Sequence, residues 1–441
     1  MRNPKLSRRT VLASSALLAA PALGQQAAKN QTQANDRIQV GVIGLGSRGY
    51  NLVDALIRHC DKARIIAVCD VDQKHYRDRP WGTGNSFGLV PGQQRIEAAY
   101  DKTGTGTKVD PYSDFRELID RDDIDAVVIA TPDHWHAFCT LQAIKAGKDV
   151  YCEKPVTHWF SEGQQVYREV AKQQAVFQTG SQQRSDWRFR RAVELVRNGH
   201  LGQMTKVEVG LPRGYDKPQG DASLAKIPDG LDYDLWCGPA TKLPYMRARH
   251  HRWWRGHSAF GGGVLMDWIG HHNDIAHWAL DTLGPIEVEA EQWIFPTTEI
   301  YDTPEQYTIR SRYEGGVEST ISTRNQAGLK LIGTDGWLRV DRGKLQTSDP
   351  RWAKQTFKPG SKRTYHSDDH MANFLDCLRT RKPCIAPAET AHRSITPGHL
   401  GYVSQELGRK LTWDPAREVV LNDQRANDLL AAQKYRSPWN V

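Results

Sequence analysis

The chain has 441 residues, which is more than a single hydrophobic core usually holds, so we expect two domains. Hydrophobic residues make up 39% and charged residues 25% of the chain, a balance typical of a globular protein that excludes a disordered or fibrous one. The formal net charge is +8, and four of the basic residues lie in the first nine positions, which contain no acid. Elsewhere acids and bases are interleaved without a basic stripe, so nucleic-acid binding is not expected.

Residues 1–36 are predicted to be an export signal followed by a linker. The segment contains the consecutive Arg8 and Arg9, then a weakly apolar run at 11–20 and small residues around Ala22, an arrangement typical of a twin-arginine signal. The apolar run is far shorter than the ~20 residues that cross a bilayer. We therefore expect no stable membrane anchor, and export of the folded protein by the twin-arginine machinery to the periplasm or beyond.

Strand-like and helical runs alternate between residues 37 and 180. The apolar runs are RIQVGVIG, ARIIAVC, IDAVVIA, KDVYC and AVFQT, and the helical runs between them include NLVDALIRHC, HAFCTLQAIKAG and SEGQQVYREVAKQ. This order predicts parallel strands with crossovers on both faces, which is a doubly wound Rossmann domain. The polar stretch 72–108 is too long for a simple crossover, and we expect a surface insertion there.

The pattern changes after residue 180. Alternating runs such as MTKVEVGLP, PIEVEAEQWIF and LKLIGTDGWLRVD predict an α+β domain over 181–407 with a large, mostly antiparallel open sheet. Helices at 189–199, 266–281 and 370–380 are expected to cover one face of this sheet. The last segment, 408–441, has no domain of its own and is expected to wrap back over the rest. The fold class is therefore α/β, with a Rossmann domain followed by an α+β domain.

A glycine-rich motif, GxGxxG, joins the first strand to the first helix. Gly44 allows the turn, Gly46 lets a pyrophosphate approach the backbone, and Gly49 permits close helix packing. Asp70 ends the second strand about 20 residues later, where a carboxylate binds a ribose 2′-hydroxyl and repels a 2′-phosphate. We therefore predict NAD as the cofactor, and the loop residues Ser47 and Arg48 belong to the expected binding set.

Two further motifs follow neighbouring strands, and they carry a resemblance to a known family. TPDHWH follows one strand and EKP the next, so both lie at the carboxyl edge of the sheet, where ligands bind. These motifs, with the runs DHWHA, DVYCEKP and GSQQRS, resemble those of the signal-bearing bacterial members of the Gfo/Idh/MocA oxidoreductase family over nearly the whole mature chain. The resemblance implies that Lys154 contacts both substrate hydroxyl and cofactor and that Pro155 forms a rigid, cis turn. The residues it places on the nicotinamide side are Thr131, Pro132, His136 and Glu153.

The second half of the expected site is the run GGGVLMDWIGHHND. Asp267 and His271 are four residues apart and share one face of a helix. Such a carboxylate can orient the imidazole through one nitrogen and leave the other to accept a proton. The family pattern has a catalytic histidine at this place, so we predict His271 as general base and Asp267 as its catalytic partner.

Several side chains near this helix allow more than one interpretation. Trp254 and Arg255, from the run MRARHHRWWRGH, together with His272, are predicted to contact substrate, because an aromatic face complements a pyranose. A solvated cationic loop is the alternative for that run, and a core position is the alternative for His272 and His277. A zinc site would need His271, Asp267, Asp274 and one of His250, His251 or His257. No closed metal-binding spacing is present, so no metal is expected.

These observations predict an oxidoreductase that acts on a secondary hydroxyl of a sugar, glycoside or polyol. Because no free NAD pool exists outside the cytoplasm, the cofactor is expected to stay bound and to be recycled on the enzyme. The alternative is an NAD-dependent glycoside hydrolase that oxidises C3 transiently and eliminates the aglycone, and a third hypothesis is a dinucleotide-binding scaffold. The resemblance implies a homodimer or homotetramer. The seven cysteines form no regular framework and are expected to be buried thiols, with a Cys377–Cys384 disulfide as an open alternative.

Overall fold

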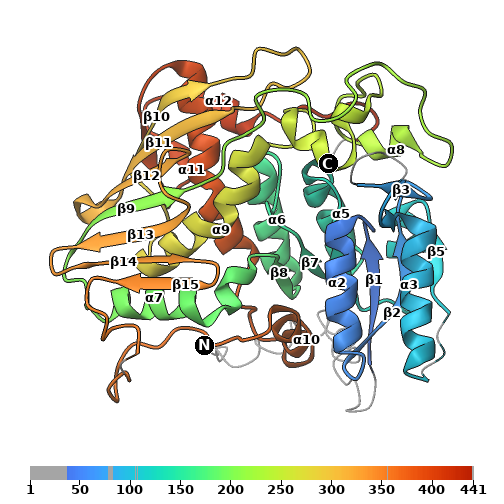
Figure 1. Ribbon diagram of the computed structural model, residues 1–441, viewed down its shortest axis with the longest axis horizontal. Coiled ribbons are helices and arrows are strands. Elements are labelled where there is room, and N and C mark those ends of the chain that lie inside the picture. Colours follow the sequence, from blue (N-terminus) through green and yellow to red (C-terminus); the bar gives the residue numbers. More distant parts are fainter. Residues whose placement is uncertain (1–36, 78–82, 105, 107, 355, 440–441) are drawn as a thin grey trace, which may run out of the picture. The chain divides into compact units, whose positions relative to one another are not determined.

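The computed structural model describes residues 37–77, 83–104, 106, 108–354 and 356–439; the predicted export signal in 1–36 lies outside them. Two sheets organise the described chain, a six-stranded and a nine-stranded one (Figure 1). A two-stranded ribbon, β3 (His75–Tyr76) and β4 (Ser86–Phe87), stands beside the first sheet. The predicted α/β class is thus confirmed. Within this part of the chain no helix is both long and apolar enough to span a membrane.

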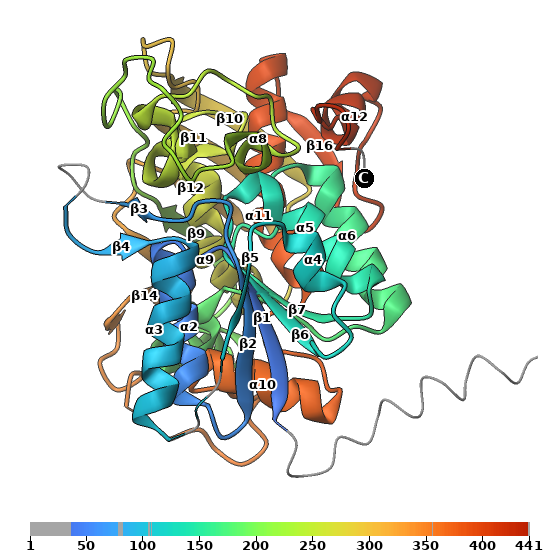
Figure 2. The same ribbon diagram turned by 90° about the vertical axis from the view of Figure 1, so that its right-hand side faces the viewer.

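The first sheet is a Rossmann sheet. Its strands are all parallel, in the order β5-β2-β1-β6-β7-β8, and β1, the first strand along the chain, lies near the middle. The strands are β1 (Ile38–Ile43), β2 (Ala63–Cys69), β5 (Asp110–Tyr112), β6 (Ala126–Ile129), β7 (Asp149–Cys152) and β8 (Phe177–Thr179). The helices are α2 (Ser47–Arg58) and α3 (Leu89–Lys102) on one face, and α4 (Phe115–Ile119), α5 (Asp133–Lys145) and α6 (Phe160–Gln173) on the other (Figure 2). The strands are almost wholly apolar because both of their faces are buried.

The polar stretch 72–108 is not the surface insertion that its composition suggested. It contains α3, whose Ile96 and Tyr100 are buried in the same core as β1 and β2. The Tyr100 hydroxyl also accepts a hydrogen bond from the backbone N–H of Ile65 on β2, at 2.8 Å. The prediction was wrong because only one side of α3 is apolar, and the many polar residues on its solvent side masked that stripe.

The second sheet has the order β15-β14-β13-β9-β12-β11-β10-β16-β17, and only the β9–β12 pair is parallel. Its strands are β9 (Met204–Gly210), β10 (Glu287–Ile294), β11 (Gln306–Arg312), β12 (Glu318–Ser322), β13 (Gly328–Gly333), β14 (Trp337–Asp341), β15 (Lys344–Thr347), β16 (Leu411–Asp414) and β17 (Val419–Val420). Helices α7 (Trp187–Arg197), α9 (Gly263–Leu280) and α11 (Ala388–Leu407) pack on one face. The last segment adds β16, β17 and α12 (Gln424–Ala431), and Trp439 packs on Trp135 and Phe138 of α5.

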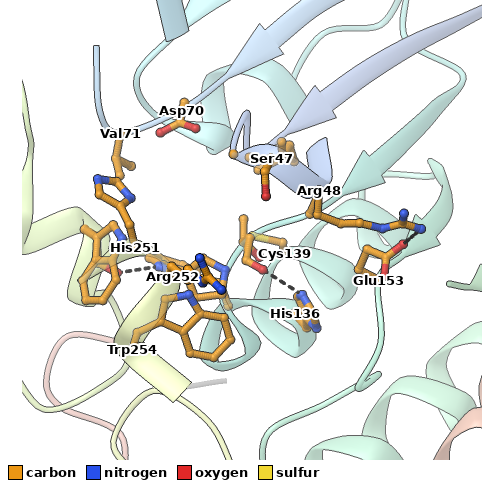
Figure 3. A pocket seen from close by; sticks show the side chains of 18 of the residues that line it. Ser47, Arg48, Asp70, Val71, His136, Cys139, Glu153, His251, Arg252 and Trp254 are labelled. Atoms are coloured by element: carbon orange, nitrogen blue, oxygen red, sulfur yellow. Dashed lines mark hydrogen bonds and ion pairs between the residues drawn. The ribbon is translucent and has the colours of Figure 1, made fainter. Parts of the chain in front are cut away.

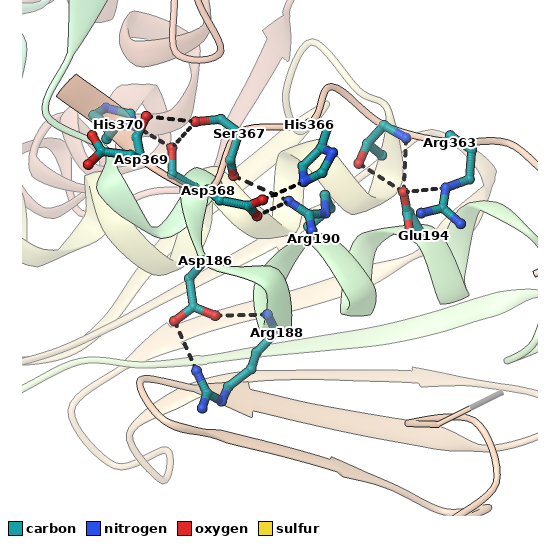
Figure 4. A network of polar contacts seen from close by, with 12 residues as sticks. Asp186, Arg188, Arg190, Glu194, Arg363, His366, Ser367, Asp368, Asp369 and His370 are labelled. Atoms are coloured by element: carbon teal, nitrogen blue, oxygen red, sulfur yellow. Dashed lines mark hydrogen bonds and ion pairs between the residues drawn. The ribbon is translucent and has the colours of Figure 1, made fainter. Parts of the chain in front are cut away.

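Helix α10 (His370–Thr380) was expected on the second sheet, but it packs on the Rossmann domain instead. Met371, Phe374 and Leu375 join the core formed by β1, β2 and α2. The segment before α10 runs along α7, where Arg190 pairs with Asp368 at 3.0 Å (Figure 4). Amphipathic periodicity predicts that a helix has a buried face, but it does not say which domain covers that face.

Cysteines follow the expectation of buried thiols. All seven are free, and six of them are buried, with only Cys60 partly exposed.

A buried ion pair between Arg184 and Asp274 holds the turn that precedes α7 against helix α9. Arg184 donates to both carboxylate oxygens of Asp274, at 2.6 and 2.9 Å, and its guanidinium lies 4.8 Å from the centre of the Trp278 ring. Both charged groups are almost fully excluded from solvent. Each is therefore tolerated only because the other is present.

We predict that Arg184→Ala lowers the free energy of unfolding by about 3–5 kcal/mol, because it leaves the Asp274 carboxylate buried without its partner. Chemical denaturation measures the loss. Arg310→Ala is the control, since it removes an exposed ion pair with Glu291 on the second sheet and should cost about 0–1 kcal/mol. Equal effects of the two substitutions would contradict the importance given to the buried pair.

Candidate functional site

The glycine loop between β1 and α2 is shaped as the motif predicts. Gly44 has φ +92°, and a Cβ on it would lie 2.7 Å from the backbone of Ala130. A Cβ on Gly49 would lie 2.1 Å from the carbonyl oxygen of Gly44, so this glycine packs beneath the loop. At Gly46, in contrast, a Cβ would meet no atom within 4 Å, so the space in front of this residue is open. Of the three glycines of the motif, Gly46 is therefore the one with open space at its Cβ position.

Helix α2 presents its N-terminus to that space. Gly46 is the N-cap residue, and no side chain caps the helix or places an acid in its first turn. The first N–H groups of a helix lack partners within it and carry partial positive charge, so they suit a phosphate. These residues thus fit the pyrophosphate of a dinucleotide.

Asp70 is held in place at the end of β2. Its two oxygens accept hydrogen bonds from the backbone N–H groups of Leu45 at 2.7 Å and Asp72 at 2.9 Å. Burial raises the pKa of this carboxyl group to about 6, so it is ionised at neutral pH. An anchored carboxylate at this position fits the hydroxyl groups of a nucleotide ribose.

These groups line a cavity of about 350 Å³, which we call the nucleotide pocket. Figure 3 shows Asp70 on one side of it and Arg48 on another, where Arg48 pairs with Glu153 at 2.7 Å. The pocket brings together nearly all of the residues predicted for the cofactor, with Gly49 alone beneath the surface. They are Gly44, Gly46, Ser47, Arg48, Asp70, Thr131, Pro132, His136, Glu153 and Lys154.

His136 joins the loops that follow β6 and β7. Its Nδ1 lies 2.6 Å from the carbonyl oxygen of Pro155, and its Nε2 lies 3.0 Å from that of Thr131. The ring is buried between the two loops and fixes one against the other. The predicted cis peptide before Pro155 is confirmed.

Lys154 reaches across to the second domain. Its Nζ donates to the side chain of Asp267 at 2.5 Å and to the backbone carbonyl of Asp267 at 2.9 Å. Arg255 also lies near this carboxylate, with Nε at 3.1 Å. Burial would raise the pKa of Asp267, but Arg255 and then Lys154 outweigh it and hold the pKa well below its usual range. Asp267 is therefore a permanent anion shared by two cations.

His271 is not oriented by Asp267 as the spacing suggested. The structure describes both residues and contains no hydrogen bond between them, and the Nδ1 of His271 has no partner among the described residues. The carboxylate of Asp267 contacts Lys154 and Arg255 instead. Burial first, and Lys154 and Arg342 next, hold the pKa of His271 well below its usual range. A neutral imidazole that can accept a proton results.

A second cavity, of about 410 Å³, opens on the other side of Lys154, and we call it the α9 pocket. Lys154 and Asp267 line both pockets, whereas His271 lines only this one. The residues that sequence reasoning did not assign to a site are Gln182, Gln183, Asp186, Phe189, Trp268 and Arg342. The two glutamines belong to the run GSQQRS, so this motif could have predicted them as site residues. Arg342, in the turn between β14 and β15, belongs to no motif that could have predicted its place.

The three predicted substrate contacts are placed differently. Trp254 and Arg255 line the nucleotide pocket and not the α9 pocket, with the guanidinium stacked 4.1 Å from the ring centre of Trp254. His272 lines neither pocket, because it is turned about 100° around α9 from His271. It is buried against Trp268 and lies 3.8 Å from Asp341. The expectation that His272 contacts substrate is therefore not supported, and the core interpretation describes its position.

The segment 211–262, between β9 and α9, crosses the nucleotide pocket, and we call it the strap. It contains α8 (Tyr233–Cys237) and two short 3-10 turns, Arg247–Arg249 and His251–Gly256. Backbone hydrogen bonds tie it to the Rossmann domain, from Asp232 to Val71 and from Gln73 to Gly230, both at 2.9 Å. The strap side chains that line the pocket are Leu235, Trp236, His251, Arg252, Trp254 and Arg255 (Figure 3).

The zinc alternative is not supported by the geometry, because Asp274 is held by Arg184 and Asp267 by Lys154. The described residues do contain a different group with metal-ligand spacing, namely Asp72, His75 and His251. Its two rings are stacked 3.6 Å apart and inclined by 14°. A histidine binds a metal in the plane of its ring at about 2.0–2.1 Å, so two stacked rings cannot share one ion. The group instead ties the strap to the Rossmann domain through the 3.0 Å contact of His251 with Asp72.

A Rossmann sheet, an uncapped glycine loop and an anchored carboxylate define a dinucleotide-binding enzyme of the oxidoreductase class. Residues 38–181 match the family model described as "Oxidoreductase family, NAD-binding Rossmann fold", and residues 187–441 match "Oxidoreductase family, C-terminal alpha/beta domain". The chain therefore belongs to the Gfo/Idh/MocA oxidoreductase family, and NAD is its cofactor.

Individual relatives are more distant. A glycosyl hydrolase family 109 protein from a Shewanella species is 36% identical over 122 residues, 27% of this chain and 23% of the relative. An inositol 2-dehydrogenase from Rhodococcus erythropolis is 28% identical over 202 residues, 46% of this chain and 51% of the relative. The alignments thus span between about a quarter and a half of these proteins.

Solved structures share the fold over most of their length. The WlbA dehydrogenase of Bordetella pertussis, in complex with NADH and UDP-GlcNAcA, has a TM-score of 0.61 over 86% of this chain and 99% of that one, at 18% identity. The aldose-aldose oxidoreductase of Caulobacter crescentus has a TM-score of 0.58 over 86% of this chain and 100% of that one, at 17% identity.

We predict that Gly46→Ala folds normally but reduces bound NAD by roughly tenfold or more, because the new methyl group occupies the space of the pyrophosphate. Nucleotide released on denaturation and the thermal midpoint are the two measurements. Gly84→Ala serves as a control for a methyl group added in open space, although its positive φ adds some strain. Full NAD occupancy in the Gly46 variant would contradict the assignment of this loop.

Proposed function

We propose that the protein is an NAD-dependent oxidoreductase that acts on a secondary hydroxyl of a sugar, glycoside or polyol and keeps its cofactor bound between turnovers. The observation that carries the proposal is the meeting of the two pockets at Lys154 and Asp267, with His271 on the α9 side. A hydroxyl carbon held in the α9 pocket lies beside the nucleotide pocket there. Relatives named as inositol dehydrogenases support a polyol or sugar as substrate.

The side chains supply the proton chemistry. When bound, NAD provides the hydride acceptor at C4 of its nicotinamide. The ammonium of Lys154 has three N–H groups, of which Asp267 takes two, so one remains for the substrate oxygen. Neutral His271 accepts the hydroxyl proton as the carbonyl forms, and Lys154 stabilises the negative charge that develops on the oxygen.

The strap supports retention of the cofactor. It covers the nucleotide pocket and is tied to the Rossmann domain by backbone hydrogen bonds and by the contact of His251 with Asp72. Release of a dinucleotide would require these contacts to open. A second carbonyl compound in the α9 pocket would then reverse the reaction, so that a full cycle needs no nucleotide exchange.

Retention also agrees with the proposed location. We propose that the twin-arginine machinery exports the folded protein, with NAD already bound, to the periplasm or beyond. A homodimer or homotetramer is the proposed assembly, because helices α7, α9 and α11 of the described chain pack on one face of the second sheet, and another copy would cover the opposite face.

An NAD-dependent glycoside hydrolase is the second candidate, and the similarity to a family 109 glycosyl hydrolase favours it. That chemistry oxidises C3, removes the C2 proton, eliminates the aglycone and adds water before the hydride returns. It requires a base for C2 besides His271. Among the described residues no tyrosine lines either pocket, so we place this candidate second.

The proposal is tested by purifying the exported protein, denaturing it and identifying the released nucleotide by mass spectrometry. We expect about one NAD or NADH per chain, and conversion of the bound NAD to NADH by a sugar or polyol. A nucleotide-free protein that binds NADP or nothing would contradict the proposal. Release of nitrophenol from nitrophenyl glycosides, without added cofactor, would favour the hydrolase.

We predict that Lys154→Ala lowers turnover by roughly a hundredfold or more, because it removes the donor to the developing oxyanion. Bound NAD should change little, whereas the thermal midpoint should fall, because Asp267 loses one of its two cations and keeps only the contact with Arg255. Lys145→Ala, at the exposed end of α5, is the control. Unchanged turnover in the Lys154 variant would overturn the assigned role.

A further inference from the structure

Gln183 has a buried amide that the fold does not use. The side chain is only 6% exposed and lines the α9 pocket, yet neither its Oε1 nor its Nε2 has a hydrogen-bond partner among the described residues. A buried amide without partners costs stability, so an unpaired one in a pocket calls for a ligand. An amide offers one acceptor and two donors, which suits two neighbouring hydroxyl groups of a sugar.

The backbone around Gln183 is fixed, so its orientation is not an accident of a loose loop. Ser181 Oγ donates to the carbonyl of Gly270 at 3.1 Å, and Gln182 Nε2 donates to the Tyr151 hydroxyl at 3.0 Å. On the other side Arg184 is paired with Asp274.

The contacts of Ser185 complete this anchoring. Its hydroxyl lies 2.9 Å from both Ser367 Oγ and His370 Nδ1, which belong to the network along α7 (Figure 4). Gln182 and Gln183 both line the pocket, and Gln183 is the residue of the run Ser181 to Ser185 whose side-chain amide has no hydrogen-bond partner among the described residues.

Charges in the α9 pocket are paired with one exception. Arg48 is paired with Glu153 at 2.7 Å, and Lys154 with Asp267 at 2.5 Å. The remaining carboxylate of the pocket, Asp186, caps α7 and lies 3.4 Å from Arg188. Arg342 is the remaining cation.

The guanidinium of Arg342 has no carboxylate partner among the described residues, although the backbone N–H of Arg342 donates to the side chain of Asp341 at 2.7 Å. Its guanidinium lies 4.9 Å from the ring centre of Trp268, which is a pocket residue itself. Because its guanidinium makes no hydrogen bond or ion pair among the described residues, its N–H groups are available to a carboxylate or a phosphate. Arg342 is therefore the cation of the pocket lining whose side chain has no carboxylate partner among the described residues, although the three carboxylates of the lining balance its three cations in number.

We propose that the substrate is an acidic sugar or polyol, whose anionic substituent is bound by Arg342 while neighbouring hydroxyl groups are bound by the amide of Gln183. The proposal rests on the proposed function, because it describes the molecule that is oxidised beside Lys154 and His271. Arg342 and Gln183 are then specificity-determining residues.

The test compares matched sugars on the NAD-loaded protein. Glucose and galactose are the neutral members, glucuronate and galacturonate carry a carboxylate, and glucose 6-phosphate carries a phosphate. Binding is followed by tryptophan fluorescence and turnover by the absorbance of reduced nicotinamide. We expect an acidic sugar to be preferred over its neutral counterpart by about tenfold to a hundredfold, mostly through KM, with the two acidic arms showing which anion is used.

Two substitutions on the β14–β15 hairpin distinguish a direct contact between Arg342 and the substrate from the general effect of positive charge near the pocket. Arg342→Gln should reduce the preference for the acidic sugar by about tenfold, whereas Lys344→Gln, which removes the same charge outside both pockets, should not. Gln183→Leu should weaken binding of acidic and neutral sugars alike.

Each outcome decides a different point. Equal turnover of acidic and neutral sugars would overturn this inference and leave the proposed function intact. Preferential binding of an acidic sugar without turnover would support the inference and contradict the proposed function. Neither binding nor turnover of any member would overturn both.

Discussion

The contact between Lys154 and Asp267 is the constraint on which the site depends. Lys154 follows a strand of the Rossmann domain and Asp267 lies on the helix that covers the second sheet, 113 positions later in the chain. The two charged groups are largely excluded from solvent, and a buried pair is stable only when its remaining hydrogen bonds are also made. The second bond of Lys154 to the backbone of Asp267 and the contact of Arg255 meet that need. The pair thereby fixes where the two pockets meet.

The protonation state of His271 follows from the same contact. Asp267, which is shared by two cations, raises the pKa of His271, but this effect is outweighed. Burial and the nearby positive charges keep the ring neutral. A neutral His271 can accept the hydroxyl proton of the substrate, and Lys154 can then donate a hydrogen bond to the oxygen that is left. The rigid turn at Gln183 and the rim at Arg342 then enclose the space in which a substrate would lie.

The sequence predicted a binding feature correctly where all the residues that form it lie in one short segment. The glycine loop is such a segment, because the turn at Gly44 and the open space at Gly46 arise from neighbouring residues. The carboxyl-edge motifs were equally readable, since consecutive parallel strands place their ends together. Helix α10 was misjudged because an apolar stripe does not identify its partner, and the stretch 72–108 was misjudged because polar residues on the solvent side of α3 masked its apolar stripe. His272 lines neither pocket, because one step along a helix turns a side chain to another face.

By itself the sequence determined the Rossmann class, the cofactor loop and the residue types of the reacting groups, since these depend on periodicity and on short motifs. Only the tertiary structure decided that Asp267 serves Lys154 rather than His271, that Trp254 and Arg255 border the nucleotide pocket, and that Gln183 and Arg342 border the α9 pocket. The physical reason is that these relations join residues far apart in the chain. Their distances are set by how α9, the strap and the β14–β15 turn pack against the Rossmann domain, which no local pattern records.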